Sequence, residues 1–152
     1  MKAVSVSVLA MLVAGTGLSV QSAVATQAEE EAVKSVIETS YIQGIHNERD
    51  VEKIRSGFHE DFNMLSFRDN AINPVSIQQW IEGIERSIER NPDPPEVPVR
   101  PDFAAVEVSG NAAVARIEVY RGDVHLYTDF MSLYKFDDGW KIVNKIYYSH
   151  PN

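Results

Sequence analysis

Apolar residues recur at spacings of three and four in two stretches of the chain, the pattern of a helix with one buried face. The first stretch covers residues 29–45, and acidic residues gather at its start, as the helix dipole favours. The second covers residues 76–88, with Ser76 at its N-terminal boundary. Between them, Asp50 is placed to cap a short helix over residues 51–56. The pattern therefore predicts three helices in the first part of the chain.

Alternating apolar and polar residues predict β-strands in the rest of the chain. One strand is expected between the second and third helices, over residues 62–67. Five of the seven prolines fall between Pro92 and Pro101 and predict an extended connector. Four consecutive strands then follow, separated by turn sequences, over residues 103–108, 112–120, 124–136 and 140–148. Helices followed by an antiparallel meander predict an α+β domain whose helices cover one face of a bent sheet.

The N-terminus has the pattern of a secretory signal. Met1-Lys2 precedes an apolar stretch from Ala3 to Ala14, and Ala23-Val24-Ala25 is a small-x-small cleavage site. A membrane anchor is the weaker interpretation, because Gly15, Thr16, Gly17 and Ser19 interrupt the stretch and no basic flank follows it. We therefore expect a signal peptide over residues 1–25 and a single mature domain over residues 26–152, exported to the periplasm or secreted.

Charge and cysteine content narrow the possible partners. Without Lys2 the chain has 13 Lys and Arg against 22 Asp and Glu, which changes the formal net charge from -8 to -9. Such a surface repels phosphate backbones and anionic headgroups, so we expect neither nucleic acid nor a membrane as partner of the mature form. The chain has no cysteine, which excludes disulfides and thiolate chemistry.

The last hairpin determines which residues face the helices. A two-residue turn at Asp138-Gly139 would place Leu133 opposite Asn144 and Asp129 opposite Tyr148. This register gathers Met131, Leu133, Trp140, Ile142 and Ile146 on one face, whereas a three-residue loop would shift the pairing by one residue. The other face would hold Phe130, Tyr134, Phe136, Val143 and Tyr147. It is too apolar for water, so we expect a homodimer through this outer face.

The segment Tyr127–Tyr147, and above all Thr128-Asp129-Phe130 and the run Gly139–Lys145, resembles the final hairpin of the putative lumazine-binding family. This family belongs to the nuclear-transport-factor-2-like superfamily, together with ketosteroid isomerases and polyketide cyclases. The segment Phe58–Phe62 and the first helix are also similar to its N-terminal half. The resemblance implies a nuclear-transport-factor-2-like cone, with three N-terminal helices packed over a curved, mainly antiparallel sheet. In polyketide cyclases an acidic residue on the corresponding strand is catalytic, and Asp129 matches it in position.

Asp129 is the candidate catalytic residue, because an inward carboxylate is costly to desolvate unless it is hydrogen-bonded or used as a general acid or base. The alternative is a buried Asp that orders the sheet through hydrogen bonds. Aromatic and methionine walls suit flat organic ligands. The predicted pocket residues are Tyr41, Met64, Trp80, His125, Tyr127, Asp129, Asn144 and Tyr148.

The four histidines, His46, His59, His125 and His150, show no HxH or HExxH spacing. We therefore expect no metal site. The sequence also has no Gly-rich phosphate loop and no Rossmann fingerprint, so we expect no cofactor. Three functional hypotheses remain open. The first is an exported domain that binds a small, largely apolar organic molecule. The second is an isomerase, cyclase or dehydratase that uses Asp129 as general acid or base, and the third is a non-catalytic dimeric interaction module.

Overall fold

The computed structural model describes the backbone of residues 17–151 and the side chains of residues 26–151. Most of the predicted signal peptide, residues 1–16, lies outside the described residues. The helices are α1 (Gly17–Val36), its π-helical continuation η1 (Ile37–Asn47), α2 (Val51–Gly57) and α3 (Ile77–Arg90). The strands are β1 (Phe58–Arg68), β2 (Ala71–Ser76), β3 (Val99–Ser109), β4 (Ala112–Arg121), β5 (Val124–Phe136) and β6 (Gly139–Ser149).

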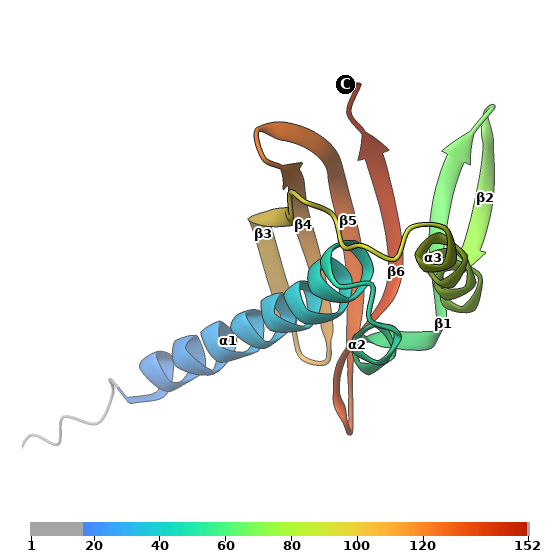
Figure 1. Cartoon of the computed structure of the whole chain (residues 1–152). Helices are drawn as coiled ribbons and strands as arrows, with labels where there is room; N and C mark the ends of the chain where they lie inside the picture. Colours follow the sequence, from blue (N-terminus) through green and yellow to red (C-terminus); the bar gives the residue numbers. More distant parts are fainter. Residues whose placement is uncertain (1–16, 152) are drawn as a thin grey trace, which may run out of the picture.

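The six strands form one sheet in the order β2-β1-β6-β5-β4-β3. Only β1 and β6 pair in parallel; the other neighbours are antiparallel. The helices gather on one side of this sheet, with α1 crossing the central strands and α3 beside β1 and β2 (Figure 1). The predicted α+β architecture, with helices over a mainly antiparallel sheet, is confirmed.

The helix boundaries follow local capping chemistry. The Asp50 carboxylate accepts hydrogen bonds from the backbone N–H groups of Glu52 and Lys53 and so starts α2, as predicted. Ser76 and Gln79 form a capping box at the start of α3. One strand was missed: residues 71–76 form β2 at the sheet edge, where Pro74 is tolerated because an edge strand has one unpaired side.

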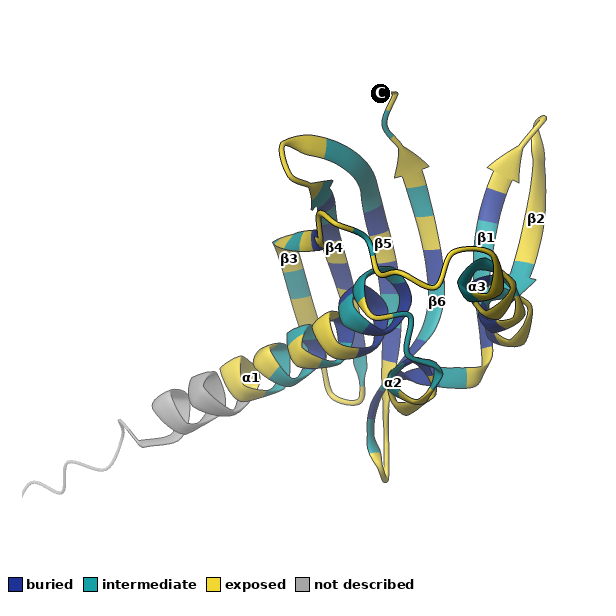
Figure 2. Ribbon diagram, in the orientation of Figure 1, coloured by how far each residue is buried: buried dark blue, intermediate teal, exposed yellow. Residues whose placement is uncertain are grey.

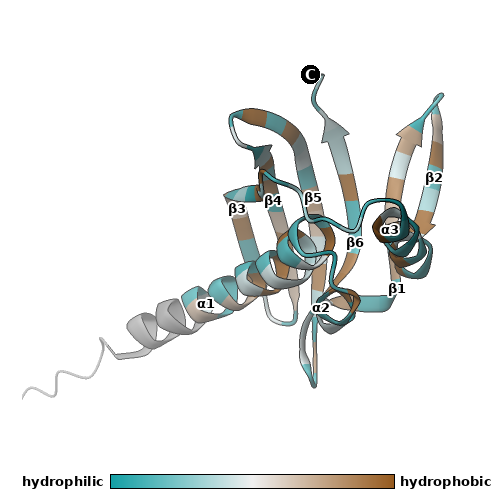
Figure 3. Ribbon diagram, in the orientation of Figure 1, coloured by the Kyte–Doolittle hydropathy of each residue, from teal (hydrophilic) through white to brown (hydrophobic). Residues whose placement is uncertain are grey.

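The core lies between the helices and the inner face of the sheet (Figure 2). The strands carry both brown, apolar and teal, polar positions, and α3 has teal, polar positions on its exposed side (Figure 3). The largest fully buried side chains of the core include Tyr41 and Ile37 of η1, Phe62 of β1, and Ile117 and Met131 of the central strands. Within residues 17–151, no helix combines the length and apolar character needed to cross a membrane.

The predicted register of the last hairpin is wrong. Phe136 pairs with Gly139 and Leu133 with Ile142, so the turn is centred one residue earlier than expected. Gly139 has a φ of 119°, a conformation that favours glycine, and it ends the turn instead of forming its centre.

A β-bulge at Val143 then shifts the pairing again, so that Met131 lies opposite Lys145 and Asp129 opposite Tyr147. The bulge reverses the alternation of β6 beyond Ile142. Lys145 is consequently 3% exposed, whereas Ile146 is 47% exposed on the outer face. The Asn144 amide donates a hydrogen bond of 2.8 Å to the backbone oxygen of Asn63 in β1, which fixes the neighbouring parallel pairing.

Candidate functional site

A cavity of about 620 Å³ opens between the helices and the ends of β1 and β6. Five elements, η1, β1, α3, β5 and β6, contribute to its wall. Aromatic side chains dominate this wall, and no acidic residue is among the described residues that line it. The lining residues are Tyr41, His46, Met64, Phe67, Arg68, Trp80, Tyr127, Lys145, Tyr147, Tyr148 and Ser149.

Lys145, Tyr41 and Asp129 form a buried polar network at the inner end of the cavity. The Tyr41 hydroxyl donates to Asp129 Oδ2 at 2.6 Å and accepts from Lys145 Nζ, also at 2.6 Å. Lys145 Nζ lies 2.8 Å from Asp129 Oδ1, as an ion pair rather than an aligned hydrogen bond. The side chains of Lys145 and Asp129 are 4% and 0% exposed. Each member therefore orders the other two, away from solvent.

Burial perturbs the protonation equilibria of this network. Burial lowers the pKa of the Lys145 ammonium, and the opposing attraction of the Asp129 carboxylate only partly offsets this effect. Burial and the negative charge of Asp129 raise the pKa of Tyr41 well above its ordinary value. Tyr41 is therefore a neutral phenol at physiological pH, consistent with its role as donor to Asp129.

Four aromatic rings surround the Lys145 ammonium. Its Nζ lies 4.4 Å from the centroid of the Tyr41 ring, 5.5 Å from Trp80, 5.7 Å from Tyr127 and 5.1 Å from Tyr147. Such distances allow cation–π attraction, which stabilises a cation in a site with little water. One of the three N–H groups of Lys145 donates to Tyr41 and the ion pair with Asp129 occupies a second, which leaves one N–H group for a ligand.

His46 supplies a second polar group at the cavity wall. Because η1 is π-helical, residues five apart lie one above the other, and the His46 and Tyr41 rings meet edge to face at 4.8 Å. Burial, followed by the charges of Lys145 and Arg121, lowers the pKa of His46 to about 3. The imidazole is therefore neutral at physiological pH. Its Nε2 is buried and has no hydrogen-bond partner among the described residues, a state that a polar ligand atom would relieve.

The structure brings together part of the predicted pocket. Tyr41, Met64, Trp80 and Tyr127 line the cavity, and Tyr148 lies at its edge, 58% exposed. Asp129 is fully buried and contacts the cavity through Lys145 and Tyr41.

Two predicted pocket residues lie elsewhere, and both corrections have the same cause. Asn144 follows the bulge in β6 and bonds to β1 instead of facing the cavity. His125 directly precedes a second bulge, between β4 and β5, where Val119 pairs with Tyr127 but Tyr120 pairs with His125. Leu126 is the extra residue, so His125 leaves the face of Asp129 and contacts Glu118 instead.

Sequence reasoning missed Lys145, Tyr147 and His46, the residues that give the cavity most of its polar character. Uniform alternation in the last strand assigned Lys145 and Tyr147 to the outer face. His46 sits at the end of a helix that was expected to be α-helical, in which positions 41 and 46 are not neighbours. A lysine within a strand otherwise rich in buried residues is the one signal that pointed to Lys145.

The arrangement of helices and sheet defines a protein of the nuclear-transport-factor-2-like class. Such a protein from Shewanella baltica OS155, of unknown function, matches with a TM-score of 0.67 and 26% identity, covering 83% of this chain and 97% of that chain. A second one, from Silicibacter pomeroyi DSS-3, matches with a TM-score of 0.65 and 17% identity, covering 82% of this chain and 98% of that chain.

Within this class, the family model "Putative lumazine-binding" matches residues 28–148, and the chain belongs to that family. The resemblance of the last hairpin is thereby confirmed. A curated relative, "Aldolase FrzH" of Cladobotryum sp., is 27% identical over 119 residues, which are 77% of this chain and 90% of that protein.

Proposed function

We propose that this protein binds a small, planar organic molecule through a carbonyl-type oxygen, with the Lys145 ammonium as donor. The observation that carries the proposal is a buried cation that faces the 620 Å³ cavity from within four aromatic rings. The membership in a family described as lumazine-binding supports a ligand of this kind.

The lining favours a particular ligand chemistry. Aromatic walls favour a flat apolar body, because offset stacking and edge contacts add to the free energy of burial. Lys145 and Arg68 are the basic lining residues, whereas Asp129 lies behind Lys145 and is already paired. A carbonyl or weakly acidic amide therefore suits the inner end better than an amine. His46 Nε2 gives a second polar contact beside it.

Lumazine itself is a suitable probe, since it is planar, has two carbonyl groups and is fluorescent. Titration of the full mature chain should show saturable binding of one lumazine per cavity. Loss of a hydrogen bond to a charged donor, at about 1.5–3 kcal/mol, predicts binding roughly 10- to 150-fold weaker in Lys145→Met.

Lys145→Met leaves the Asp129 carboxylate buried without its partner and therefore destabilises the fold. The double variant Asp129→Asn/Lys145→Met removes both charges and is the better variant for comparing affinities. Lys135→Met, on the exposed part of β5, is the matched control and should keep the affinity of the original protein. Equal affinities for the original protein and the double variant would refute the assignment of Lys145 as ligand donor.

A second candidate function is carbonyl chemistry of the aldol type, and the relationship to a protein named an aldolase favours it. In a retro-aldol cleavage, the bond between the α and β carbons breaks and its electrons form an enolate. The proton of the β-hydroxyl group passes to water as that carbon becomes the aldehyde, and the enolate carbon takes up a proton from water to give the ketone. A Lys145 N–H at the ketone oxygen would stabilise the negative charge that develops there. In this scheme Asp129 is a positioning residue that acts through Lys145 and Tyr41.

A fluorogenic β-hydroxyketone that releases a fluorescent naphthaldehyde tests this activity. The folded protein should accelerate release above the rate in buffer, and the double variant Asp129→Asn/Lys145→Met should not. Lys135→Met serves again as control. Binding of lumazine without any acceleration would leave the binding function and eliminate the aldol-type reaction for this class of substrate.

Export and self-association complete the proposal. The leader-like residues 1–25 support export, and N-terminal sequencing of the secreted or periplasmic form should begin near Thr26. On the outer sheet face, Val114, Phe130 and Ile146 are 51%, 45% and 47% exposed and line one shallow hollow, which supports a homodimer through this face.

A further inference from the structure

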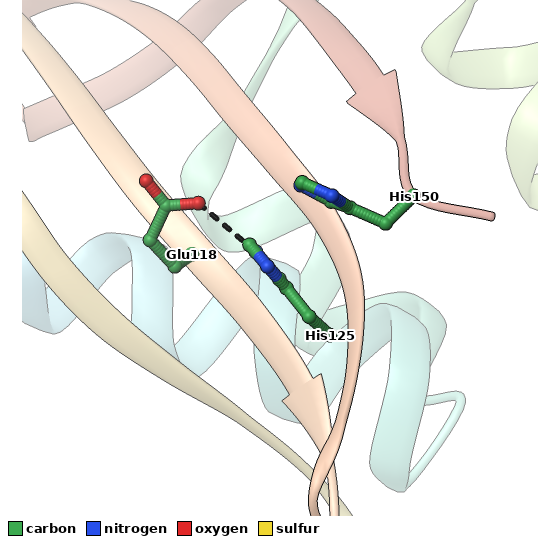
Figure 4. A group of neighbouring side chains, drawn as sticks. All are labelled: Glu118, His125 and His150. Atoms are coloured by element: carbon green, nitrogen blue, oxygen red, sulfur yellow. Dashed lines mark hydrogen bonds and ion pairs between the residues drawn. The ribbon is translucent and has the colours of Figure 1, made fainter. Parts of the chain in front are cut away.

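Glu118, His125 and His150 form a cluster on the sheet face opposite the cavity. Their ligand atoms, one carboxylate oxygen and two imidazole nitrogens, all lie within 4.8 Å of one another. Figure 4 shows the three side chains approaching from β4, β5 and the segment after β6. The sequence spans 32 positions between the first and the last of them, which is why no spacing motif predicted the group.

Two local features create this cluster. The bulge at Leu126 turns His125 away from the cavity face and pairs it with Tyr120, against which its ring stacks at 4.5 Å. The chain after β6 continues alongside β5, and the backbone N–H of His150 donates to the Leu126 carbonyl at 2.9 Å. The His125 and His150 rings consequently stack at 3.7 Å, with the His150 ring also edge-on to Tyr148.

Hydrogen bonds through Thr128 connect the polar atoms of the group. Glu118 Oε2 accepts from the Thr128 hydroxyl and lies 3.0 Å from His125 Nε2. Thr128 Oγ1 also lies 3.0 Å from His150 Nε2. Because the hydroxyl has one proton, which it donates to Glu118, both imidazoles must present N–H groups to these oxygens. A metal ion bound at both Nε2 atoms would require each imidazole to carry its proton on Nδ1 instead, while Thr128 keeps its hydroxyl proton.

The Glu118 carboxylate is held in place by its neighbours on the sheet. Arg116 Nε donates to the other oxygen, Oε1, at 3.1 Å and holds the carboxylate in place. Support of this kind behind a ligand fixes its orientation and increases metal affinity.

We propose that Glu118, His125 and His150 bind a divalent first-row transition-metal ion, with Zn²⁺ as the best-suited occupant. Two imidazoles and one carboxylate are a donor set that zinc uses at about 2.0–2.2 Å from each ligand, with open positions left for water or an exogenous group. The hard cations Ca²⁺ and Mg²⁺ prefer all-oxygen sites.

Binding requires only a small rearrangement. Ligand atoms around a tetrahedral zinc lie roughly 3.4 Å apart, a separation that follows from bonds of about 2.0–2.1 Å. The present maximum of 4.8 Å must therefore shorten. His150 can make this movement without disturbing the sheet, because it follows the last strand. The alternative is a purely hydrogen-bonded Glu-Thr-His network that binds no metal.

Titration of the full mature chain, without a polyhistidine tag, tests the site. Zn²⁺ in competition with a chromophoric chelator should give one ion per chain. Co²⁺ substitution should give the visible absorption bands of a four- or five-coordinate ion with nitrogen and oxygen ligands. Glu118→Gln, His125→Ala and His150→Ala should each weaken binding at least about tenfold, since even loss of supporting residues costs about 10- to 100-fold.

His59→Ala is the matched control. His59 stacks on Phe136 beside the β5–β6 turn, away from the cluster, so this substitution should not change the affinity for Zn²⁺. His150→Ala keeps the test decisive if His125→Ala fails to fold. Absence of Zn²⁺ binding, or equal affinity in the original protein and His150→Ala, would overturn the proposal in favour of the hydrogen-bonded network.

Discussion

The ion pair between Lys145 and Asp129 makes the sharpest quantitative prediction. Each charge has lost nearly all its contact with water, so each depends on the other. At their separation of 2.8 Å, with an effective dielectric constant of about 20, the attraction amounts to about 6 kcal/mol. Removing one partner from such a pair costs about 3–5 kcal/mol, because the remaining charge stays buried. Asp129→Asn and Lys145→Met should each lower the free energy of unfolding by this amount.

The double variant separates the ion pair from general packing effects. Asn retains an oxygen for Tyr41, and Met has a length and volume close to those of the lysine stem, so the double variant buries no unpaired charge. We expect its loss to be smaller than the sum of the two single losses by at least about 2 kcal/mol, a coupling typical of residues in direct contact.

Urea unfolding followed by tryptophan fluorescence measures all four proteins, and unchanged m values confirm that the same surface is exposed. Trp80 and Trp140 report from the cavity and from the last hairpin, respectively. An exposed ion pair would give a different result: each single variant would lose less than about 1 kcal/mol of unfolding free energy, and the two losses would add in the double variant. That result would refute a buried network at the inner end of the cavity.

Four further predictions concern other parts of the molecule. Burial holds the His46 imidazole neutral, with a pKa of about 3 against 6.5 in the unfolded chain. The contribution of His46 to the free energy of unfolding is therefore fully present above pH 6.5 and is lost as the pH falls toward 3. Between pH 7 and pH 5 the original protein should lose about 2 kcal/mol of unfolding free energy more than His46→Gln, measured by urea titration. A Cβ at Gly57 would lie 2.1 Å from Ser40 Oγ, so Gly57→Ala should destabilise by about 1–3 kcal/mol. A Cβ at Gly83 in α3 would have a side-chain atom at 4.0 Å as its nearest neighbour, so Gly83→Ala should stabilise the protein by up to about 1 kcal/mol. A higher melting temperature for Gly57→Ala than for Gly83→Ala would contradict both glycine predictions. Phe130→Glu should convert the proposed dimer to a monomer in light scattering, and an unchanged mass would exclude the outer face as interface.

The sequence predicted the elements well because local periodicity and capping chemistry determine them. The apolar stripe of residues 76–88 became α3, and the Asp50 cap became the start of α2. The strand over residues 71–76 was missed because Asn73-Pro74 is a turn signal that an edge strand can accommodate. Each of these outcomes depends on residues close to one another in the chain.

The site was predicted less well because two β-bulges determine which side chains enter the cavity. Strand alternation placed Asp129 and Tyr127 on the inner face, where Asp129 is fully buried and Tyr127 lines the cavity. After Val143, the same rule assigned Lys145 to the outer face, although its side chain lies on the inner face. On the N-terminal side of Leu126, it assigned His125 to the inner face, although His125 lies on the outer face. A bulge depends on pairing with a neighbouring strand, and no pattern in a single strand announces it.

A crystal structure of the protein with lumazine tests the central claim most directly. The ring should lie among Tyr41, Trp80 and Tyr127, with a carbonyl oxygen within hydrogen-bond distance of Lys145 Nζ. Lumazine bound elsewhere, or bound in the cavity with only water beside Lys145 Nζ, would contradict the assignment of this buried ammonium as the group that recognises the ligand.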